Sequence, residues 1–388
     1  MSYATAASTR PCVVCRTCSL NHRQPMHSAW QQSLAAKHLL PLLRDCNHAA
    51  SMSLADWDDT VRLARQARLL GLIAGRLKEN PGVWEQIPQR VRGHLQSSIN
   101  FSAHRQQMMR IELRALDKAL PPSITVILLK GAAYIAQEQE FARGRMPNDV
   151  DLLVSRHDID AAETALTSAG WVSETTDAYD QRYYREWSHE LPPMRFPGHA
   201  LEVDLHHTIT PVTSRVRAND ALLFSSIQPV PDSRFFALQP FDQIIHAAIH
   251  LFQDSELTGH LRDFVDLDGM IRRAIHEEND WRELQQRADQ HGAGRYLWYA
   301  LRYCSAWLDT PTPKLTTVQP PSPFVQRLMD TLLTRGTLPR LPDAPLGLGE
   351  RIATQAGVMR YHYLRMPPRL LSRHLAHKAI SSIRGWTK

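Results

Sequence analysis

The chain has 388 residues, of which 43% are hydrophobic, and a formal net charge of +6. The length suffices for two domains or for one elaborated domain, and so small a charge does not by itself indicate nucleic-acid binding. The longest apolar runs, such as residues 126–129, are far too short to cross a bilayer, and the N-terminus has no apolar segment of signal-peptide length. We therefore expect a cytoplasmic protein with no transmembrane segment.

Residues 1–25 show neither helical nor strand periodicity, which predicts a disordered leader. The five cysteines of the chain do not indicate a disulfide framework. Three of them, Cys12, Cys15 and Cys18, have a spacing like that of metal ligands. The candidates for a fourth ligand are His22, His27 and Cys46. Because no second CxxC pair follows at a matching distance, the disordered leader is favoured over a metal site.

Residues 26–120 are predicted to form an N-terminal helical region, because apolar residues recur at spacings of three and four. Ser53 is a candidate N-cap, with Asp56 in the first turn of the helix that follows. A long helix is expected over about 88–119. We expect these helices to form a bundle that packs on the sheet that follows, with their frequent arginines on a solvated face.

Residues 121–235 are predicted to form a compact α/β core. The expected elements, in chain order, are a strand at 124–129, a helix at 132–140, a strand at 149–154, a helix near 157–169 and a strand at 201–207. Residues 171–200 are expected to be an extended excursion, strand-like at 182–185. Its aromatic and basic residues either stack on a base or sugar or, as we favour, pack at a sheet edge: Tyr183, Tyr184, Arg185 and Trp187.

The strand at 149–154 carries two aspartates, Asp149 and Asp151. Because side chains alternate along a strand, both project from one face while the apolar residues project from the other. Two like charges this close repel each other unless a cation lies between them. Mg²⁺ often binds one or two carboxylates together with substrate phosphates, so the leading interpretation is a metal–nucleotide site.

A third carboxylate lies on the strand at 201–207, where Glu202, Asp204 and His206 share one face. If this strand pairs beside the strand at 149–154, Asp204 completes a cluster of three carboxylates.

These motifs together resemble the nucleotidyltransferase superfamily with the DNA polymerase β-like fold. The resemblance is closest to the bacterial branch labelled uncharacterised nucleotidyltransferase, through residues 129–131 (LKG), Arg145, residues 149–154 (DVDLLV) and residues 203–206 (VDLH). It is strongest over about 124–208. It implies an α+β fold with a polymerase β-like core, in which helices flank a mixed sheet, and with N- and C-terminal helical regions.

The resemblance also implies roles for individual residues. Asp149, Asp151 and Asp204 would bind Mg²⁺, or Mn²⁺ in its place, and Asp204 would help to deprotonate the acceptor hydroxyl. Gly131 would let the backbone approach the triphosphate, and Ala132 would offer a main-chain N–H to it. Three further side chains are candidate nucleotide contacts: Lys130, Arg145 and His206.

The sequence departs from the family pattern immediately after the motif glycine. Many active members of the superfamily have Ser there, whose hydroxyl helps to hold phosphate, whereas this chain has Ala132 and Ala133. The main-chain amides remain. The missing hydroxyl slightly favours a protein that binds nucleotide without turning it over.

Residues 236–310 are predicted to be a C-terminal helical domain, with helices from Pro240, over 260–275 and over 280–308. His246 and His250 lie four apart on one helix face and can bind a metal, although a core role is favoured. Residues 311–350 are expected to be a proline-containing linker and helix. Residues 351–388 have eight Lys or Arg and no Asp or Glu, so this basic amphipathic tail either touches an anionic surface or docks on the protein.

The sequence thus predicts a metal-dependent nucleotidyltransferase that moves a nucleoside monophosphate from an NTP to an unidentified acceptor and releases pyrophosphate. A sugar, a natural product, a peptide and RNA are all compatible acceptors. One alternative is a catalytically weak or inactive nucleotide-binding scaffold of a biosynthetic pathway. The other is an RNA- or membrane-associated modifier that uses the basic tail.

Overall fold

The structure is a computed structural model, and it describes residues 28–175, 177–254, 257–313 and 318–365, together with residues 367, 369, 371 and 372. The predicted leader and its metal-like motif lie outside the described residues, as does most of the basic tail beyond residue 365: Cys12, Cys15, Cys18, His22 and His27 belong to this part.

A mixed seven-stranded sheet in the order β3-β4-β5-β2-β1-β7-β6 forms the centre of the molecule. β2 pairs in parallel with β5 and antiparallel with β1, and β1 pairs in parallel with β7. The predicted α+β class is confirmed by this sheet and the helices around it. The strands are β1 Ile127–Leu128, β2 Asp149–Leu153, β3 Val172–Ser173, β4 Met194–Arg195, β5 Glu202–His206, β6 Gln228–Pro229 and β7 Phe236–Ala237.

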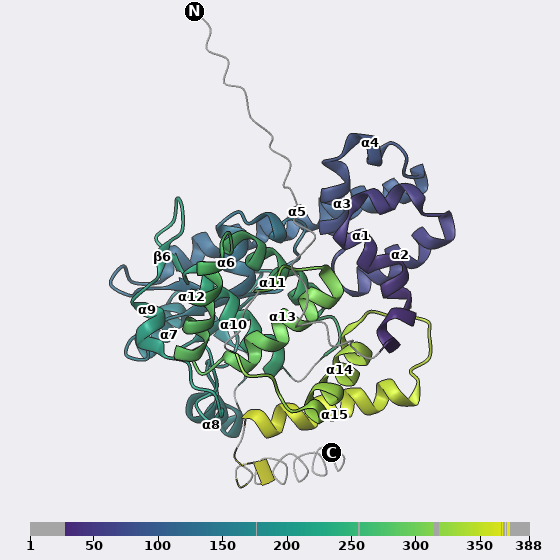
Figure 1. Ribbon diagram of the computed structural model, residues 1–388. Helices are drawn as coiled ribbons and strands as arrows, with labels where there is room; N and C mark the ends of the chain where they lie inside the picture. Colours follow the sequence, from purple (N-terminus) through teal and green to yellow (C-terminus); the bar gives the residue numbers. More distant parts are fainter. Residues whose placement is uncertain are drawn as a thin grey trace, which may run out of the picture.

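The N-terminal part is helical, as predicted. Its first helices form a lobe at the side of the molecule, and the long α5 contacts β2, α6 and α7 (Figure 1). Ser53 and Asp56 form a capping box at the start of α2, which confirms the predicted N-cap. The helical segments are η1 Ser28–Gln32, η2 Ala35–Leu39, α1 Leu40–Arg44, η3 Cys46–Ser51, α2 Leu54–Gln66, α3 Leu70–Lys78, α4 Pro81–Trp84 and α5 Gln89–Ala119.

The predicted strand-like segment at 182–185 is wrong, because residues 178–187 form a helix, α8 (Ala178–Trp187). Tyr183 and Trp187 are one helical turn apart, with ring centroids 5.9 Å apart. Tyrosine and tryptophan also favour strands, which is why this short segment was ambiguous. The other helices of the core are α6 Lys130–Ala136, η4 Glu140–Ala142, α7 Ile159–Ser168 and α9 Asp220–Phe224.

The C-terminal helices pack beside the core. The single helix expected at 280–308 is wrong, because the chain breaks between α12 and α13 at Gly292, whose φ of +62° ends the first helix. The apolar pattern continues on both sides of this break and so conceals it. The helices are α10 Pro240–Gln253, α11 Leu261–Ala274, α12 Glu278–Gln290, α13 Gly294–Leu308, α14 Pro323–Thr337 and α15 Leu348–Arg365.

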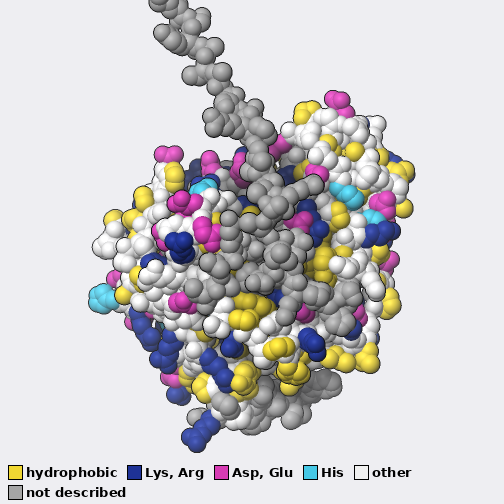
Figure 2. Space-filling view, in the orientation of Figure 1, with side chains coloured by type: hydrophobic (Ala, Val, Ile, Leu, Met, Phe, Trp, Pro, Cys, Tyr) yellow, Lys and Arg dark blue, Asp and Glu magenta, His cyan; other side chains and the backbone are white. Residues whose placement is uncertain are grey.

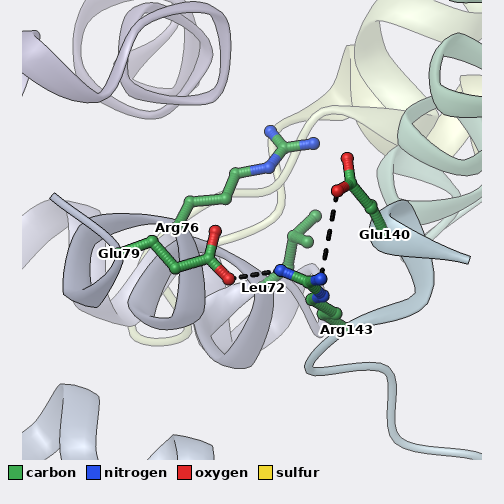
Figure 3. Close-up of a pocket in the computed structure, with 5 residues that line it drawn as sticks. All are labelled: Leu72, Arg76, Glu79, Glu140 and Arg143. Atoms are coloured by element: carbon green, nitrogen blue, oxygen red, sulfur yellow. Dashed lines mark hydrogen bonds and ion pairs between the residues drawn. The ribbon is translucent and has the colours of Figure 1, made fainter. Parts of the chain in front are cut away.

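Ion pairs at a small pocket join the N-terminal lobe to the core (Figure 3). Arg143 follows η4 and pairs with Glu79 at the end of α3, and its other guanidinium nitrogen lies 3.9 Å from Glu140. The pocket has a volume of about 90 Å³, and Leu72 and Arg76 complete its lining. Because the arginine and both acids are exposed and mutually paired, we interpret this pocket as a junction rather than a ligand site.

A tighter contact lies beside this junction, where two glycines bring backbone against backbone. A Cβ on Gly144 would lie 2.2 Å from the carbonyl carbon of Gly71 in α3, and Gly144 has a φ of +74°. From α5, Gln106 donates hydrogen bonds to the carbonyl oxygens of Ala142 and Arg145, 3.0 and 3.1 Å away. The loop that leads to Arg145 is thus fixed by α3 and α5 together.

We predict that Gly144→Ala lowers the free energy of unfolding by roughly 2–5 kcal/mol, because left-handed backbone strain adds to a backbone clash. Chemical denaturation of the variant measures the loss. Gly198→Ala is the matched control, since Gly198 has a φ of +86° but open space around its Cβ position. Equal losses in the two variants would contradict the close approach of Gly71 and Gly144.

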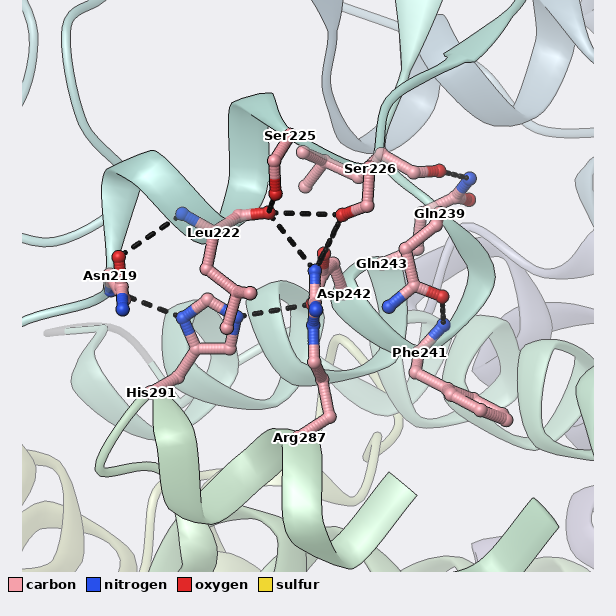
Figure 4. A network of polar contacts seen from close by, with 11 residues as sticks. Asn219, Leu222, Ser225, Ser226, Gln239, Phe241, Asp242, Gln243, Arg287 and His291 are labelled. Atoms are coloured by element: carbon pink, nitrogen blue, oxygen red, sulfur yellow. Dashed lines mark hydrogen bonds and ion pairs between the residues drawn. The ribbon is translucent and has the colours of Figure 1, made fainter. Parts of the chain in front are cut away.

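A buried polar network holds α9, α10 and α12 together (Figure 4). Asp242 of α10 is completely buried and accepts two hydrogen bonds of 2.6 Å from Arg287. His291 Nδ1 accepts from the main-chain N–H of Asn219, so its Nε2 carries the hydrogen that reaches Asp242, 3.1 Å away. Burial alone would raise the pKa of Asp242, but hydrogen bonds from Arg287 and His291 outweigh it and lower the pKa.

Asp242→Asn should destabilise the fold by about 3–5 kcal/mol at neutral pH, because it leaves the Arg287 charge buried without a counter-ion. A lowered pKa in the folded state stabilises the protein above the ordinary pKa near 4, and this contribution is lost as the pH falls below it. Denaturation at several pH values should therefore show a smaller acid loss in the variant than in the wild type. Parallel curves would contradict the assignment.

No helix of the described residues is both long and apolar enough to cross a membrane. The long terminal helix α15 nevertheless exposes an apolar stripe at helical spacing, formed by Leu348, Ile352, Met359 and Tyr363. Hydrophobic side chains gather on the lower part of the face shown in Figure 2, over α14 and α15.

Candidate active site

Parallel pairing of β2 with β5 decides where the predicted acidic residues lie. Asp149 lies opposite Glu202, and Asp151 lies opposite Asp204. Because side chains alternate along each strand, the carboxylates share one face and the apolar residues the other. The structure therefore brings the three predicted carboxylates together on neighbouring strands. The apolar set is completely buried: Val150, Leu152, Val203 and Leu205.

Asp151 is buried and is held by two partners. Its Oδ1 accepts a hydrogen bond of 2.8 Å from Lys130 Nζ and lies 3.0 Å from Nε2 of His206. Burial alone would raise the pKa of Asp151, but Lys130 and His206 outweigh it and hold the pKa well below its usual value. Asp151 is therefore ionised, and Lys130 and His206 contact it directly.

Asp204 has the opposite electrostatic setting. Burial, together with the charges of Asp151 and Glu190, raises the pKa of its carboxyl to about 8. Its Oδ1 is buried and accepts no hydrogen bond from the described residues. A carboxylate that is crowded by like charges and lacks a donor is stabilised by a cation.

Asp149 lies at the exposed end of β2, where basic side chains reach it from outside the sheet. Loss of surrounding water and the charge of Asp151 raise the pKa of Asp149, while Lys130, Arg145 and Arg262 oppose this shift. Arg262 belongs to α11, more than a hundred residues along the chain. No sequence pattern indicated this proximity, because the acids nearest to Arg262 in the sequence lie on the same helix.

Arg145 is buried and already has partners in the structure. Its guanidinium pairs with Asp266 of α11 and lies 5.4 Å from the centre of the Tyr134 ring. A Cβ on Gly131 would lie 2.9 Å from Nε of Arg145, so the absence of a side chain at Gly131 makes room for this arginine. Burial, with the charge of Arg262, lowers the pKa of Arg145 to about 10.

Lys130 and Gly131 begin the seven-residue helix α6, which packs against β2. Lys130 has a φ of +42°, a left-handed conformation that costs about 1–3 kcal/mol for a residue other than glycine. Burial alone would lower the pKa of Lys130, but Asp151 raises it. Gly131 and Ala132 are both buried, so their main-chain amides are not open to solvent.

A pocket of about 190 Å³ adjoins the acidic face and was not anticipated from the sequence. Glu190 belongs to the pocket lining and connects it to the acidic face. Its carboxylate lies 3.5 Å from His206 Nε2 and 3.6 Å from His189 Nε2. Glu190 lies in the segment expected to be an excursion, and no motif distinguished it. The lining comes from four parts of the chain: His189, Glu190, Ile209, Pro211, Ile249, His250, Gln253, Asp254, Tyr361 and Arg365.

Among the described residues, one group of three has its ligand atoms close enough together to hold a metal ion, and it is not the three carboxylates of β2 and β5. The three carboxylates of β2 and β5 present oxygen ligands, which suit Mg²⁺ or Mn²⁺, and the unpartnered Oδ1 of Asp204 fits such an ion. His189, Glu190 and His206 have ligand atoms within 4.8 Å of one another. Nδ1 of His189 lies 3.1 Å from an Arg365 nitrogen, however, and an imidazole that accepts there has its hydrogen on Nε2 and no lone pair for a metal. By the chemistry of its donor atoms alone, the set of three carboxylates suits Mg²⁺ better than this group does.

A family model described as "Uncharacterised nucleotidyltransferase" matches residues 53–309. The chain belongs to this family. Membership suggests nucleotidyl transfer as the general activity, with an NTP as substrate. The match ends before α14 and α15, so these helices lie outside the family model.

The search of curated proteins finds no match. A structure described as "Crystal structure of JHP933 from Helicobacter pylori" is similar over 74% of this chain and 98% of that chain, with 13% sequence identity. Its TM-score of 0.30 is too low to imply a shared function or fold.

We predict that Arg145→Ala and Asp266→Ala each cost about 3–5 kcal/mol of stability, because each leaves one buried charge unpaired. The double variant should lose clearly less than the sum of the two. Chemical denaturation of the three variants measures this coupling. Arg182→Ala is the control: its pair with Glu186 on α8 is exposed, and the expected loss is below about 0.5 kcal/mol. Additive losses at Arg145 and Asp266 would contradict a buried ion pair.

Proposed function

We propose that the protein is a metal-dependent nucleotidyltransferase that moves a nucleoside monophosphate from an NTP to an acceptor hydroxyl and releases pyrophosphate. The observation that carries the proposal is the opposition of Asp151 and Asp204 on paired strands, with a buried Asp204 oxygen that has no donor. We further propose that this sheet and its helices form a polymerase β-like core.

Asp149, Asp151 and Asp204 would hold Mg²⁺, or Mn²⁺ in its place. When bound, the metal would neutralise charge on the triphosphate and on the leaving pyrophosphate. Asp204 is the residue to accept the proton of the acceptor hydroxyl, because its buried Oδ1 accepts no hydrogen bond from the described residues. Lys130 and His206 keep Asp151 ionised and fix its orientation.

The surroundings of Lys130 and Arg145 favour different roles for these two predicted nucleotide contacts. Lys130 is the favoured phosphate contact, because it already stands beside the acids as a cation. Arg145 is paired with Asp266 and fills the space at Gly131, so we assign it to shaping the site. For the same reason the amides of Gly131 and Ala132 would reach a phosphate only if Arg145 moved.

The burial of these amides and the alanine after Gly131 favour the alternative of a nucleotide-binding scaffold that turns over slowly or not at all. Calorimetric titration with each NTP and Mg²⁺, beside a pyrophosphate-release assay, separates binding from turnover. Binding without pyrophosphate release, in the presence of a wide panel of acceptors, would support the scaffold.

Substituting the acids tests the enzymatic proposal. Asp149→Asn and Asp204→Asn should each reduce Mg²⁺-dependent pyrophosphate release by at least about 100-fold, because loss of a direct metal ligand exceeds the 10–100-fold effect of outer partners. Melting temperatures should stay near that of the wild type. Glu186→Gln, an exposed acid on α8, should leave the rate unchanged. Full activity in Asp149→Asn would overturn the assignment.

The hypothesis of an RNA- or membrane-associated modifier is favoured only by the exposed stripe of α15 and the basic residues that follow it. Because α15 packs on the core, a truncation that tests this hypothesis should begin after Arg365. Loss of binding to RNA or to anionic vesicles on deletion of residues 366–388 would support it, and unchanged binding would remove it.

A further inference from the structure

The pocket beside the acidic face is the strongest unassigned feature of the molecule. It shares Glu190 with that face, since the Glu190 charge acts on Asp204 and its carboxylate lies 3.5 Å from His206. Glu190 and His206 therefore connect the pocket to Asp151, although the three carboxylates are not among its lining residues. The helix α15, which lies outside the family match, contributes Tyr361 and Arg365 to the lining.

One buried acceptor in the pocket, on Gln253, has no donor among the described residues. Gln253 is 6% exposed, and its amide nitrogen donates to Ser214 and Tyr296 at 3.2 and 3.0 Å. Its Oε1 accepts no hydrogen bond from the described residues. A buried carbonyl oxygen without a donor is costly, and a ligand with an O–H or N–H group would satisfy it.

The charges of the lining point to the same kind of ligand. Within the part of the chain that the structure describes, the lining holds two carboxylates, Glu190 and Asp254, and one arginine, Arg365. Asp254 also lies 3.6 Å from His260. The Arg365 guanidinium already contacts the Tyr361 hydroxyl and lies 3.1 Å from His189 Nδ1. A triphosphate would meet net repulsion here, whereas hydroxyl and amino groups would find charged acceptors.

The size of the pocket limits the part of a ligand that can enter it. A volume of about 190 Å³ corresponds to about six water molecules at liquid density. That is room for a molecule of monosaccharide size. Ile209, Pro211 and Ile249 supply an apolar wall against which a ring can pack.

We propose that this pocket binds the acceptor, and that the acceptor, or the part of it that enters, is a monosaccharide-sized group rich in hydroxyl or amino groups. This inference rests on the proposed nucleotidyl transfer. An acceptor hydroxyl oxygen would form a bond to the α-phosphorus, the bond from that phosphorus to the bridging oxygen would break, and pyrophosphate would leave with the electron pair. The hydroxyl proton would pass to Asp204.

Binding of small probes in the absence of NTP and metal tests the pocket separately from catalysis. We would titrate the full chain with glucosamine, myo-inositol and glucose, and compare inorganic pyrophosphate and glucose 6-phosphate, by ligand-observed NMR. At least one of the first three should bind saturably at millimolar concentration, and the two anionic probes should bind more weakly. Absence of saturable binding by all three, or tighter binding of an anion, would overturn the proposal.

Two substitutions locate the binding. Glu190→Gln should weaken the best probe about tenfold, the fold-change expected on loss of a charged hydrogen-bond acceptor. Gln253→Leu should weaken it as well, with Gln243→Leu on the same helix and Glu186→Gln on α8 as matched controls that leave it unchanged. Binding that is insensitive to Glu190→Gln would place the probe elsewhere and refute the pocket, even if Gln253→Leu fails to fold.

Asp149→Asn separates this proposal from the proposed function. The variant should retain probe binding at the pocket while losing pyrophosphate release. If it instead retains pyrophosphate release and binds the probe, the role of the acids fails while the ligand class of the pocket stands. If release is lost but no donor-rich probe binds, the pocket proposal fails and the enzymatic one stands.

Discussion

The parallel register between β2 and β5 is the constraint on which the site depends. A shift of one residue would turn the acids of β5 into the apolar side of the sheet and bring Val203 or Leu205 to the acidic side. Because the apolar residues of both strands are completely buried, such a shift would remove them from the core. The hydrophobic side of the sheet thus fixes the carboxylates on its other side, although they repel one another.

The repulsion between Asp151 and Asp204 is offset more at Asp151, by its cationic partners, than at Asp204, so the pKa values of the two carboxyls differ. Asp151 has Lys130 and His206 and stays ionised, whereas Asp204 has a pKa of about 8. Paired carboxylates whose surroundings separate their pKa values are typical of sites that assign different tasks to chemically identical groups. The strained φ of Lys130 is consistent with this, since the cation is held in place at a cost to its backbone.

The strand pattern was predictable because it is local. Alternation in residues 149–154 and 201–207 predicted the shared faces, and the three carboxylates do lie on adjacent strands. Glu190 and Arg262 were not predictable, since each reaches the site through tertiary packing and neither lies in a pattern that points to it. Helix α8 was misassigned because tyrosine and tryptophan suit strands as well as helices. Local periodicity identified the acids, but only the packing of α10, α11 and α15 shows what surrounds them.

The acidic strands and the pocket lining differ in their relation to the family match. The acidic strands lie within the family match, whereas α15, which closes the pocket with Tyr361 and Arg365, lies beyond it. In the transfer that we propose, the same three carboxylates would serve every acceptor, so acceptor choice would be set by elements outside the family match, such as α15. The main chain of residues 364 and 365 accepts hydrogen bonds from Arg215 and Thr213, in the loop after β5. Helix α15 is thus anchored to the loop that follows β5, and a change at Tyr361 would act on the pocket lining rather than on the pairing of β2 and β5.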